Sequence, residues 1–490
     1  MRPLQRCGRL VGLALAMLAA AVFVLAGSAA ASFPGRDGAL AVQPVTGSGI
    51  VVVNANGSGE RVVHATVTVH CGGCGSSSRL ISPAWSPDGR VMLVDGVTSV
   101  GGEEALIYPD GSCLDCRFPV AGVDGAFTNQ PALFTAVSQS SGPHGSALSE
   151  YGIDGVETGL PQSGPVSHPA WSSRGELAVV RGRRIWAGTL PRLRPLVPGS
   201  MPSWSPDGRQ IVFERGGWLR VGRVRGRLFR RLVRGSAPVW SPNGRWIAFF
   251  AKHHRLSIVP ASGGHVRHVG KMTGTAVDWQ PLPATPPIPC LAPSDSRVWA
   301  TTGTAVVTYH GVQQPYGSYP TGPSSIWALM GCLRADGRER LLETGGDYFG
   351  SSTDVSQVVL AGNYAGAVIG GGGKYCGDSG YVELFDLRTG AQVPDRGGEG
   401  AACGNVSAVL SIDQLALGSD AVSAVHMTEG PYMGSTVSEE IQASDSTGVH
   451  TLDSVSEPSG SPYQLTNLAL TGDTLTWEHN GTARSAQLQP

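Results

Sequence analysis

Cysteine pairs are the residues of this 490-residue chain whose spacing most directly permits chemistry. Cys71 and Cys74 are separated by two residues, as are Cys113 and Cys116, and His70 precedes the first pair. These are the ligand types of a zinc site and the spacing of a redox-active dithiol. The strand–helix–strand context of thioredoxin-like redox pairs is absent from the sequence. We therefore predict two local disulfides, with zinc binding and redox chemistry as the alternatives.

The N-terminus indicates export, which would place the cysteines in an oxidising compartment. Three arginines precede an apolar run at 10–25, and alanines at 29–31 form a small-residue cleavage site. Residues 1–31 are predicted to be a signal peptide; the alternative, a membrane anchor, needs about 20 apolar residues. Cleavage removes Cys7 and leaves eight cysteines, an even number. Besides the two local pairs, we expect Cys290–Cys332 and Cys376–Cys403, because each closes a short loop.

Other reactive patterns in the sequence are incomplete. The Gly-Asp-Ser-Gly at 377–380 matches a serine-protease nucleophile turn over four residues only, without the histidine setting of that family. Glycines 370–373 lack the spacing of a phosphate-binding loop. The sequence also lacks the Gly-x-Ser-x-Gly nucleophile elbow of α/β-hydrolases. Neighbouring His253 and His254 would point to opposite faces of a strand. We assign no catalytic residue, no cofactor and no metal.

Arginines form the strongest charge feature. Eight lie within 215–234, and six of them define the basic sector: Arg220, Arg223, Arg225, Arg227, Arg230 and Arg231. Residues 32–284 carry 25 basic and 16 acidic side chains, a net +9, whereas 285–490 carry 8 and 21, a net −13. The sector is predicted to face an anionic partner, which could be an envelope surface, a polyanion or the acidic half of this chain. The alternative is a solvated strand in an arginine-rich genome.

A repeat organises the elements that carry these residues. A Pro-x-Trp-Ser-Pro-Asp-Gly-Arg unit, with local variations, recurs around tryptophans that are 33 and 36 residues apart, and an earlier copy lies 86 residues upstream, about two periods. A degenerate copy at 130–133 is expected in that gap, with Leu133 in the tryptophan position. The repeat residues are Trp85, Asp88, Gly89, Trp171, Trp204, Asp207, Gly208, Trp240, Asn243, Gly244 and Trp279.

Each unit predicts a strand, a tight turn and a second strand. Proline fixes φ, Asp or Asn bonds the local backbone, and glycine accepts a positive φ. The following apolar run indicates a buried strand, and the tryptophan can fill the space between two sheets. Further turns, such as Pro109-Asp110-Gly111, give two hairpins per unit of about 40 residues, the content of one four-stranded propeller blade.

The unit resembles the TolB-type (WD-repeat-like) β-propeller repeat of exported bacterial proteins over residues 33–284. We expect a six-bladed propeller at 32–281, with units starting near residues 81, 131, 168, 201 and 237 and an incomplete one at 33–63. The segment 275–281, which contains Trp279, is expected to supply the missing strand and close the ring, which removes exposed sheet edges.

The remaining chain continues the strand–turn pattern without the repeat. Six prolines at 281–293 indicate a semi-rigid linker, assigned to 282–293. Residues 294–490 are predicted to form a second β-rich, degenerate propeller-like domain, with a β-sandwich as second choice. Hairpins are expected around Asp336-Gly337 and Arg388-Thr389-Gly390. The fold class is all-β throughout.

These features favour an exported, periplasmic or extracellular, non-catalytic binding or scaffold protein of the cell envelope. Its partner would be a protein, peptide or glycan, with peripheral contact to an anionic surface, no nucleic acid and a monomeric state. The alternative is a propeller enzyme, a hydrolase or lyase, acting at a channel mouth. Carboxylates and histidines gathered at one mouth would favour that alternative, because fold alone decides neither.

Overall fold

The computed structural model describes residues 32–490 except 66, 69–75, 78, 98–101, 121, 139–146, 163–165, 227, 285–288, 314–324, 347–350, 374–375, 394–407, 432–435 and 460. The predicted signal peptide and the Cys71/Cys74 pair lie outside this part. The chain is all-β, apart from a 3-10 turn, η1 (Lys252–His254). No helix in the described part is long and apolar enough to cross a membrane. Two compact units are present, the second made mainly of residues 288–490.

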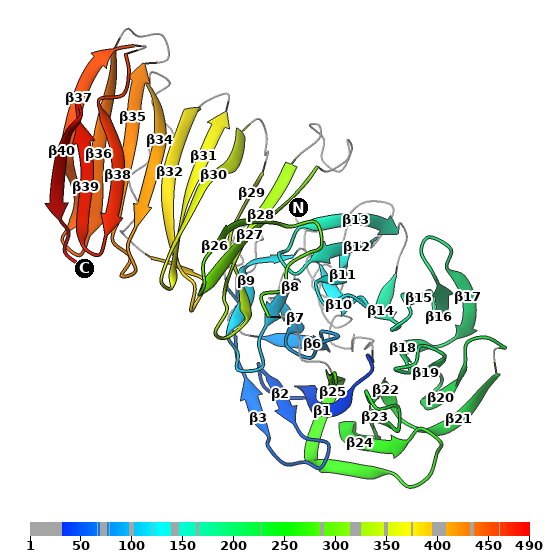
Figure 1. Cartoon of the computed structure of the whole chain (residues 1–490). Helices are drawn as coiled ribbons and strands as arrows, with labels where there is room; N and C mark the ends of the chain where they lie inside the picture. Colours follow the sequence, from blue (N-terminus) through cyan, green and yellow to red (C-terminus); the bar gives the residue numbers. More distant parts are fainter. Residues whose placement is uncertain are drawn as a thin grey trace, which may run out of the picture. The chain divides into compact units, whose positions relative to one another are not determined.

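Four-stranded antiparallel sheets build the first unit, and Figure 1 shows them around a common centre. They are β6 (Leu80–Trp85), β7 (Met92–Val97), β8 (Gly102–Ile107) and β9 (Cys113–Val120); β10 (Val123–Phe127), β11 (Leu133–Ser138), β12 (Ala147–Gly152) and β13 (Glu157–Gln162); β14 (Ser167–Trp171), β15 (Leu177–Arg181), β16 (Arg184–Gly188) and β17 (Arg194–Pro198); and β18 (Ser200–Trp204), β19 (Gln210–Glu214), β20 (Trp218–Arg223) and β21 (Leu228–Arg234). A separate short pair is β4 (Val67–Thr68) and β5 (Ser76–Ser77).

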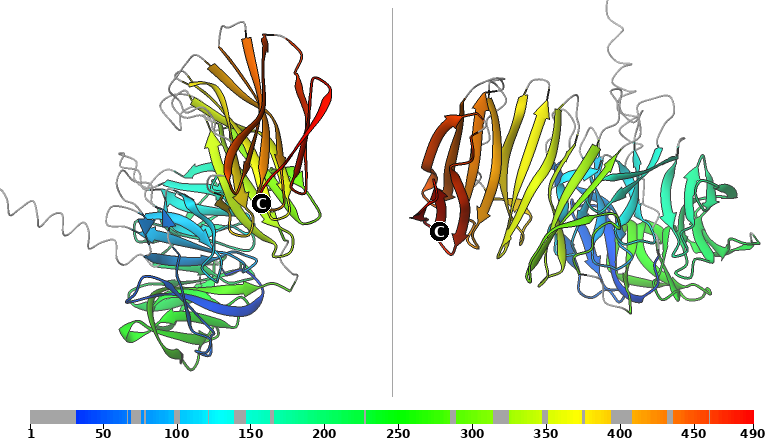
Figure 2. Two further views of the ribbon diagram at one scale, coloured as in Figure 1. Left: turned by 90° about the vertical axis from the view of Figure 1, so that its left-hand side faces the viewer. Right: turned by 45° about the horizontal axis from the view of Figure 1, so that its top comes forward.

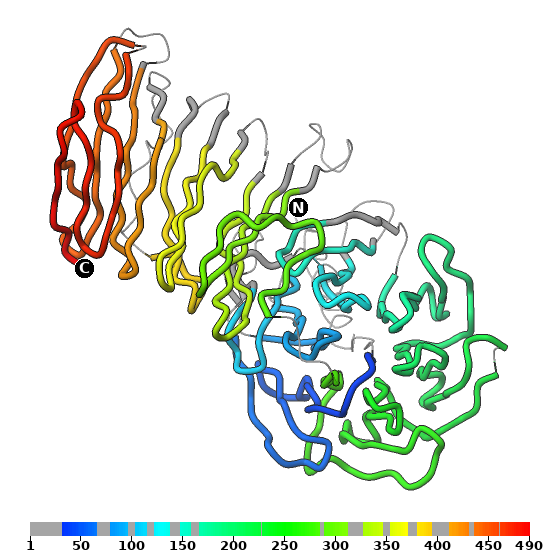
Figure 3. Tube along the Cα trace, in the orientation of Figure 1, coloured from blue at the N-terminus to red at the C-terminus, as the bar shows by residue number. Residues whose placement is uncertain are grey.

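A seven-stranded sheet joins the two ends of the repeat region. Its order is β22 (Ser236–Trp240), β23 (Trp246–Phe250), β24 (Arg255–Pro260), β25 (Arg267–Leu282), β1 (Arg36–Pro44), β2 (Ile50–Val53) and β3 (Arg61–Val63). The first half of β25 pairs with β24, and its second half pairs with β1, where Trp279 lies opposite Leu40. The trace in Figure 3 brings these segments, far apart in sequence, side by side. This is the expected closing pairing; counting β25 in two blades gives the six that we propose.

The repeat motif folds through its own side chains. The Ser86 hydroxyl donates to Asp88 Oδ1 at 2.6 Å and accepts from the backbone N–H of Val91 at 3.1 Å. Ser205 and Ser241 donate in the same way to Asp207 and Asn243. The glycine after each has φ between +65° and +73°, the left-handed region that glycine enters without strain. The turns therefore form as the sequence predicts.

The repeat tryptophans pack in the interior of the first unit. Trp85, Trp204 and Trp279 are at most 1% exposed. Trp204 donates its indole N–H to the carbonyl of Ala170 in the preceding sheet at 3.0 Å. Each ring thus buries a large apolar area, and the indole N–H groups of Trp204 and Trp279 are hydrogen-bonded, whereas that of Trp85 has no partner.

The degenerate copy is not where the sequence analysis placed it, and this prediction was wrong. The innermost strand of the third sheet is β10, which ends at Phe127, and Leu133 begins the next strand. Phe127 is 1% exposed and occupies the tryptophan position. Thr128 replaces the serine, because its N–H donates to the carbonyl of Leu133 as that of Ser86 does to Val91. A smaller aromatic ring fills the same space, so the unit carries no Trp-Ser-Pro signature.

The second unit consists of stacked antiparallel sheets, seen from two more sides in Figure 2. Its strands are β26 (Arg297–Thr301), β27 (Ala305–Gln313), β28 (Ser325–Leu333), β29 (Arg338–Gly346), β30 (Ser351–Ala361), β31 (Tyr364–Gly373), β32 (Cys376–Asp386), β33 (Ala391–Gln392), β34 (Ala408–Leu417), β35 (Ser423–Pro431), β36 (Thr436–Asp445), β37 (Gly448–Pro458), β38 (Leu465–Thr471), β39 (Thr474–His479) and β40 (Thr482–Gln487). One parallel bridge, Ser379 to Leu410, joins β32 to β34. Successive apolar clusters pack each group of strands on the next, as blades do.

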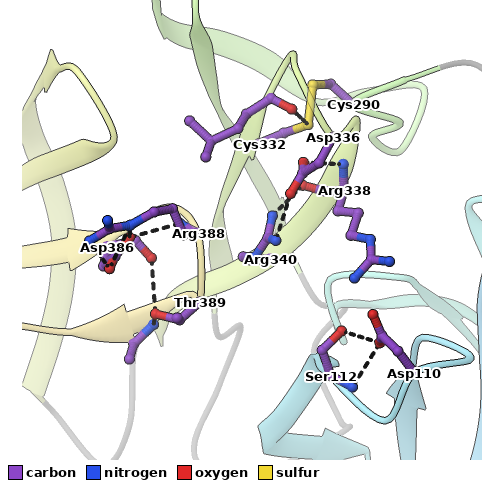
Figure 4. Close-up of polar contacts among 12 residues, drawn as sticks. Asp110, Ser112, Cys290, Cys332, Asp336, Arg338, Arg340, Asp386, Arg388 and Thr389 are labelled. Carbon is purple, nitrogen blue, oxygen red and sulfur yellow. Dashed lines mark hydrogen bonds and ion pairs between the residues drawn. A yellow bond between two sulfur atoms is a disulfide. The ribbon is translucent and has the colours of Figure 1, made fainter.

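Aspartates fix the predicted turns, as Figure 4 shows. Asp336 accepts from the backbone N–H of Arg338 at 2.9 Å, and Asp386 accepts from that of Arg388 at 2.8 Å. Asp110 accepts from the N–H of Ser112 in the first unit at 3.0 Å. These contacts close the hairpins β28–β29 and β32–β33 and the β8–β9 turn at the predicted places.

A disulfide joins Cys290 to Cys332, the pairing that the sequence predicts, with an S–S distance of 2.09 Å. The N–H of Cys290 also donates to the carbonyl of Gly337 at 3.2 Å. The end of the expected linker is therefore attached to the second unit. Cys113 is also disulfide-bonded, whereas the side chains of Cys116 and Cys376, and all of Cys403, lie outside the described part. Their partners stay predictions.

By their contacts, residues 113–118 of β9 and residues 151–159 around the β12–β13 turn group with the second unit, although these strands pair within sheets of the repeat region. Within the second unit, the buried ring of His310 lies between two carboxylates, with Nδ1 2.7 Å from Asp154 and Nε2 3.0 Å from Asp295. Burial lowers the pKa of His310, but the hydrogen bond and charge of Asp154, together with Asp295, outweigh it and raise that pKa. The ring is thus hydrogen-bonded to Asp154 and within ion-pair distance of Asp295, so it brings three separate segments of the unit together.

Candidate binding sites

The basic sector lies on the two outermost strands of one sheet. Arg220 and Arg223 are on β20, Arg230 and Arg231 are on β21, and Arg220 lies opposite Arg231 in the ladder. Arg225 lies in the turn between them, and Arg227 lies outside the described residues. The structure thus brings five of the six predicted residues onto one edge of the propeller.

Neighbouring strands extend this positive surface. Residues 181–236 contain 14 arginines and only two acidic residues, Asp207 and Glu214. Asp207 is held by Ser205 in its turn, and Glu214 is half-buried. In the part of the chain that the structure describes, no sector arginine forms an ion pair with a carboxylate. The sector therefore keeps a net positive charge among the described residues.

Aromatic rings position some of these arginines. The guanidinium groups of Arg231 and Arg234 lie 5.3 and 4.8 Å from the ring centre of Trp218. Arg230 donates to the carbonyl of Ala261 at 2.6 Å. Stacking restrains a guanidinium without neutralising it, so the donors stay available. Arg220 differs, because its Nε is buried without a hydrogen-bond partner.

Two neighbouring cavities lie where β24, β25 and β1 meet. The first, of about 550 Å³, is lined by Lys252, His253, Arg255, His268 and Lys271 among others. The second, of about 480 Å³, shares Lys271 and Thr273 with it and is otherwise lined by the residues around the β1–β2 turn. Of the two neighbouring histidines named in the sequence analysis, His253 lines the first cavity, together with His268 from β25.

A buried acidic cluster lies across two neighbouring sheets, β6–β9 and β10–β13. Asp95 on β7 is opposite Glu104 on β8, and both are at most 2% exposed. The backbone N–H of Asp124, at the start of β10, donates to Asp95 at 3.2 Å. Asp124 in turn accepts from the backbone N–H of His168. The carboxylates therefore tie neighbouring sheets together.

Burial determines the protonation of this cluster. It raises the pKa of Asp95 to about 7, and it raises that of Glu104 well above its usual range, with the Asp95 charge adding to the effect. Burial also raises the pKa of Asp278 to about 7; this residue accepts the N–H of Trp85 in the next sheet at 2.6 Å. No group of three side chains suited to hold a metal ion occurs among the described residues.

Sequence reasoning missed both the cluster and the cavities. Asp95, Glu104 and Asp124 lie in ordinary strand segments; strand pairing brings Asp95 to Glu104, and the contact between two sheets adds Asp124. One sequence signal for the first cavity exists, because two of the chain's three lysines line it.

No family model and no curated protein matches the chain. Among solved structures it is similar to TolB from Acinetobacter baumannii, with 16% identity, a TM-score of 0.40 and coverage of 57% of this chain and 74% of that one. A TolB candidate from Agrobacterium tumefaciens has 17% identity and a TM-score of 0.35, with coverage of 50% of this chain and 99% of that one. A chain of the nidogen/laminin complex has 10% identity and a TM-score of 0.37, with the same two coverages. The propeller assignment itself rests on the sheets described above.

Proposed function

We propose that this chain is an exported, non-catalytic propeller of the bacterial cell envelope that binds a polyanionic partner through the basic sector. The observation that carries the proposal is the sector itself: exposed arginines on β20, β21 and their turn, without carboxylate partners among the described residues. Of the partner classes left open, protein, peptide and glycan, an acidic glycan fits best, because a polymer can contact several arginines at once. Guanidinium groups bind oxyanions through paired hydrogen bonds.

Retention on a sulfated-polysaccharide resin tests this proposal. The mature chain should elute at high salt, and the variant Arg223→Gln/Arg225→Gln/Arg231→Gln should elute at clearly lower salt. The control Arg36→Gln/Arg297→Gln/Arg484→Gln removes the same charge from exposed positions outside the sector and outside the arginine-rich residues 181–236. Because counter-ions are released with each contact, affinity should fall steeply with salt. Equal losses in both variants would show a general charge effect and contradict the proposal.

The acidic cluster favours a second candidate function, acid–base catalysis at a channel mouth. Asp95, Glu104 and Asp124 lie together, and His168 Nδ1 is 3.9 Å from Asp124. Raised carboxyl pKa values also occur in general acids. Against this function stand the burial of all three carboxylates and the bonds of Asp95 and Asp124 to backbone amides. Hydrolysis of a glycan library by the wild type but not by Asp124→Asn would support catalysis.

A further inference from the structure

The two joined cavities at β24, β25 and β1 have chemically different linings. The first presents Lys252, Arg255 and Lys271 together with two histidines, and no acidic residue lines it. Three permanent positive charges around one cavity of about 550 Å³ repel one another unless an anion lies between them. Lysine is rare in this chain, with three copies against 33 arginines, yet two line this cavity. That concentration of lysines points to a ligand rather than to composition.

The backbone and hydrogen bonds around the first cavity restrict its side chains. His253 and His254 have φ of +60° and +57°, a region that costs non-glycine residues about 1 kcal/mol or more and recurs at functional sites. His268 Nδ1 lies 2.8 Å from the Ser257 hydroxyl, which fixes the ring and leaves Nε2 for another partner. The ring of His268 is thus held in place before a ligand arrives.

The second cavity offers hydroxyl, carboxylate and backbone groups instead of cations. Thr46, Ser48 and Glu60 line it beside Lys271. Gly47 has φ of +111°, and a Cβ at Gly49 would come within 2.5 Å of the Val63 carbonyl oxygen. The turn therefore requires glycine at both positions, and both glycines line the cavity. Such groups exchange hydrogen bonds with the hydroxyls of a polyol.

We infer that these joined cavities bind a phosphorylated polyol, such as a sugar phosphate. The phosphate lies among Lys252, Arg255 and Lys271, and the hydroxyls contact Thr46, Ser48 and Glu60. Each cavity is within the usual size of small-molecule sites, about 300–1,000 Å³. The site is separate from the basic sector, so either proposal stands without the other. The same chemistry could be presented free in solution or on a lipid headgroup.

Calorimetric titration of the mature full chain tests the inference, with glucose 6-phosphate, inorganic phosphate and glucose as probes. We expect glucose 6-phosphate to bind at least tenfold more tightly than inorganic phosphate, and glucose alone to bind weakest. Lys252→Ala/Lys271→Ala should weaken both phosphate probes at least tenfold. Glu60→Gln should weaken only the sugar phosphate. Unchanged thermal melting of the variants verifies their folding, since the three side chains are exposed.

Matched controls separate this site from general charge effects. Arg225→Gln removes an exposed positive charge of the basic sector and should leave glucose 6-phosphate affinity unchanged. Lysine-dependent binding of phosphatidylglycerol vesicles, without binding of the free sugar phosphate, would support the same chemistry with a headgroup as its source. Absence of binding to all phosphate probes at millimolar concentration, or an equal loss in Arg225→Gln, would overturn the inference.

Discussion

At the scale of single residues, buried carboxylates give the fold an unusual pH dependence. The pKa of Asp278 is raised from 3.8 to about 7 by burial, and that of Asp95 likewise. The folded state therefore binds more protons than the unfolded chain between pH 4 and 7. This stability is present below pH 4 and is lost as pH rises through 7. Since one pKa unit corresponds to about 1.4 kcal/mol, the loss is measurable.

Urea unfolding at pH 5 and pH 8 measures this effect. We expect the mature chain to have a lower free energy of unfolding at pH 8 than at pH 5. This difference should be smaller in Asp278→Asn, because asparagine keeps an acceptor for the N–H of Trp85 but cannot ionise. Asp207 is the control, because its hydrogen bond from Ser205 and backbone contacts lower its pKa despite partial burial. Asp207→Asn should leave the difference between pH 5 and 8 unchanged. A chain more stable at pH 8 would contradict the prediction.

Cys290 and Cys332 support a second prediction at this scale. Their disulfide closes a loop with a sequence separation of 42 residues, which restricts the unfolded chain and is worth about 4 kcal/mol. Cys290→Ser/Cys332→Ser should unfold at correspondingly lower denaturant concentration. Non-reducing peptide mapping should also find Cys71–Cys74, Cys113–Cys116 and Cys376–Cys403. Free thiols at these positions, or stoichiometric zinc, would disprove those pairings.

At the scale of elements, the end of β25 closes the first unit. Residues 276–279 pair with β1, and Trp279 is 1% exposed in the same core. Replacing residues 275–281 by a Gly-Ser segment of equal length keeps the chain connected but removes this ladder and its ring. The exposed edges of the sheets should then cause aggregation and a lower melting temperature. A monomeric variant with unchanged melting would contradict closure and the proposed count of six blades.

At the scale of the whole molecule, the two halves carry opposite net charges of +9 and −13. Because charges interact strongly only within the Debye length of about 8 Å at physiological salt, any attraction depends on close approach. If the basic sector contacts the acidic half, scattering should show a particle that expands at high salt. If it contacts the envelope instead, the dimensions of the particle should not change with salt. The wild-type chain should then bind anionic vesicles, and a variant with Ser at Arg220, Arg223, Arg225 and Arg227 should not. Salt-independence of both measurements would refute a functional basic sector.

The sequence by itself determined what depends on neighbouring residues. Ser86, Asp88 and Gly89 make their turn with their own side chains and backbone, so the motif was sufficient to predict it. Hairpins at Asp336 and Asp386 follow for the same reason. Trp279 at one period from Trp240 indicated the closing strand, and clustered arginines indicated the basic sector, because both are visible as spacing along the chain.

Tertiary structure decided what depends on contacts between distant strands. Phe127 replaces a tryptophan because the space between two sheets accepts either ring, and no local rule distinguishes that position from Leu133. Asp95 and Asp124 meet only where one sheet lies beside the next. The joined cavities combine Thr46 with Lys271, more than two hundred residues apart. The cavities depend on the register of β25 against β1, and that register forms only when the two ends of the repeat region pack together.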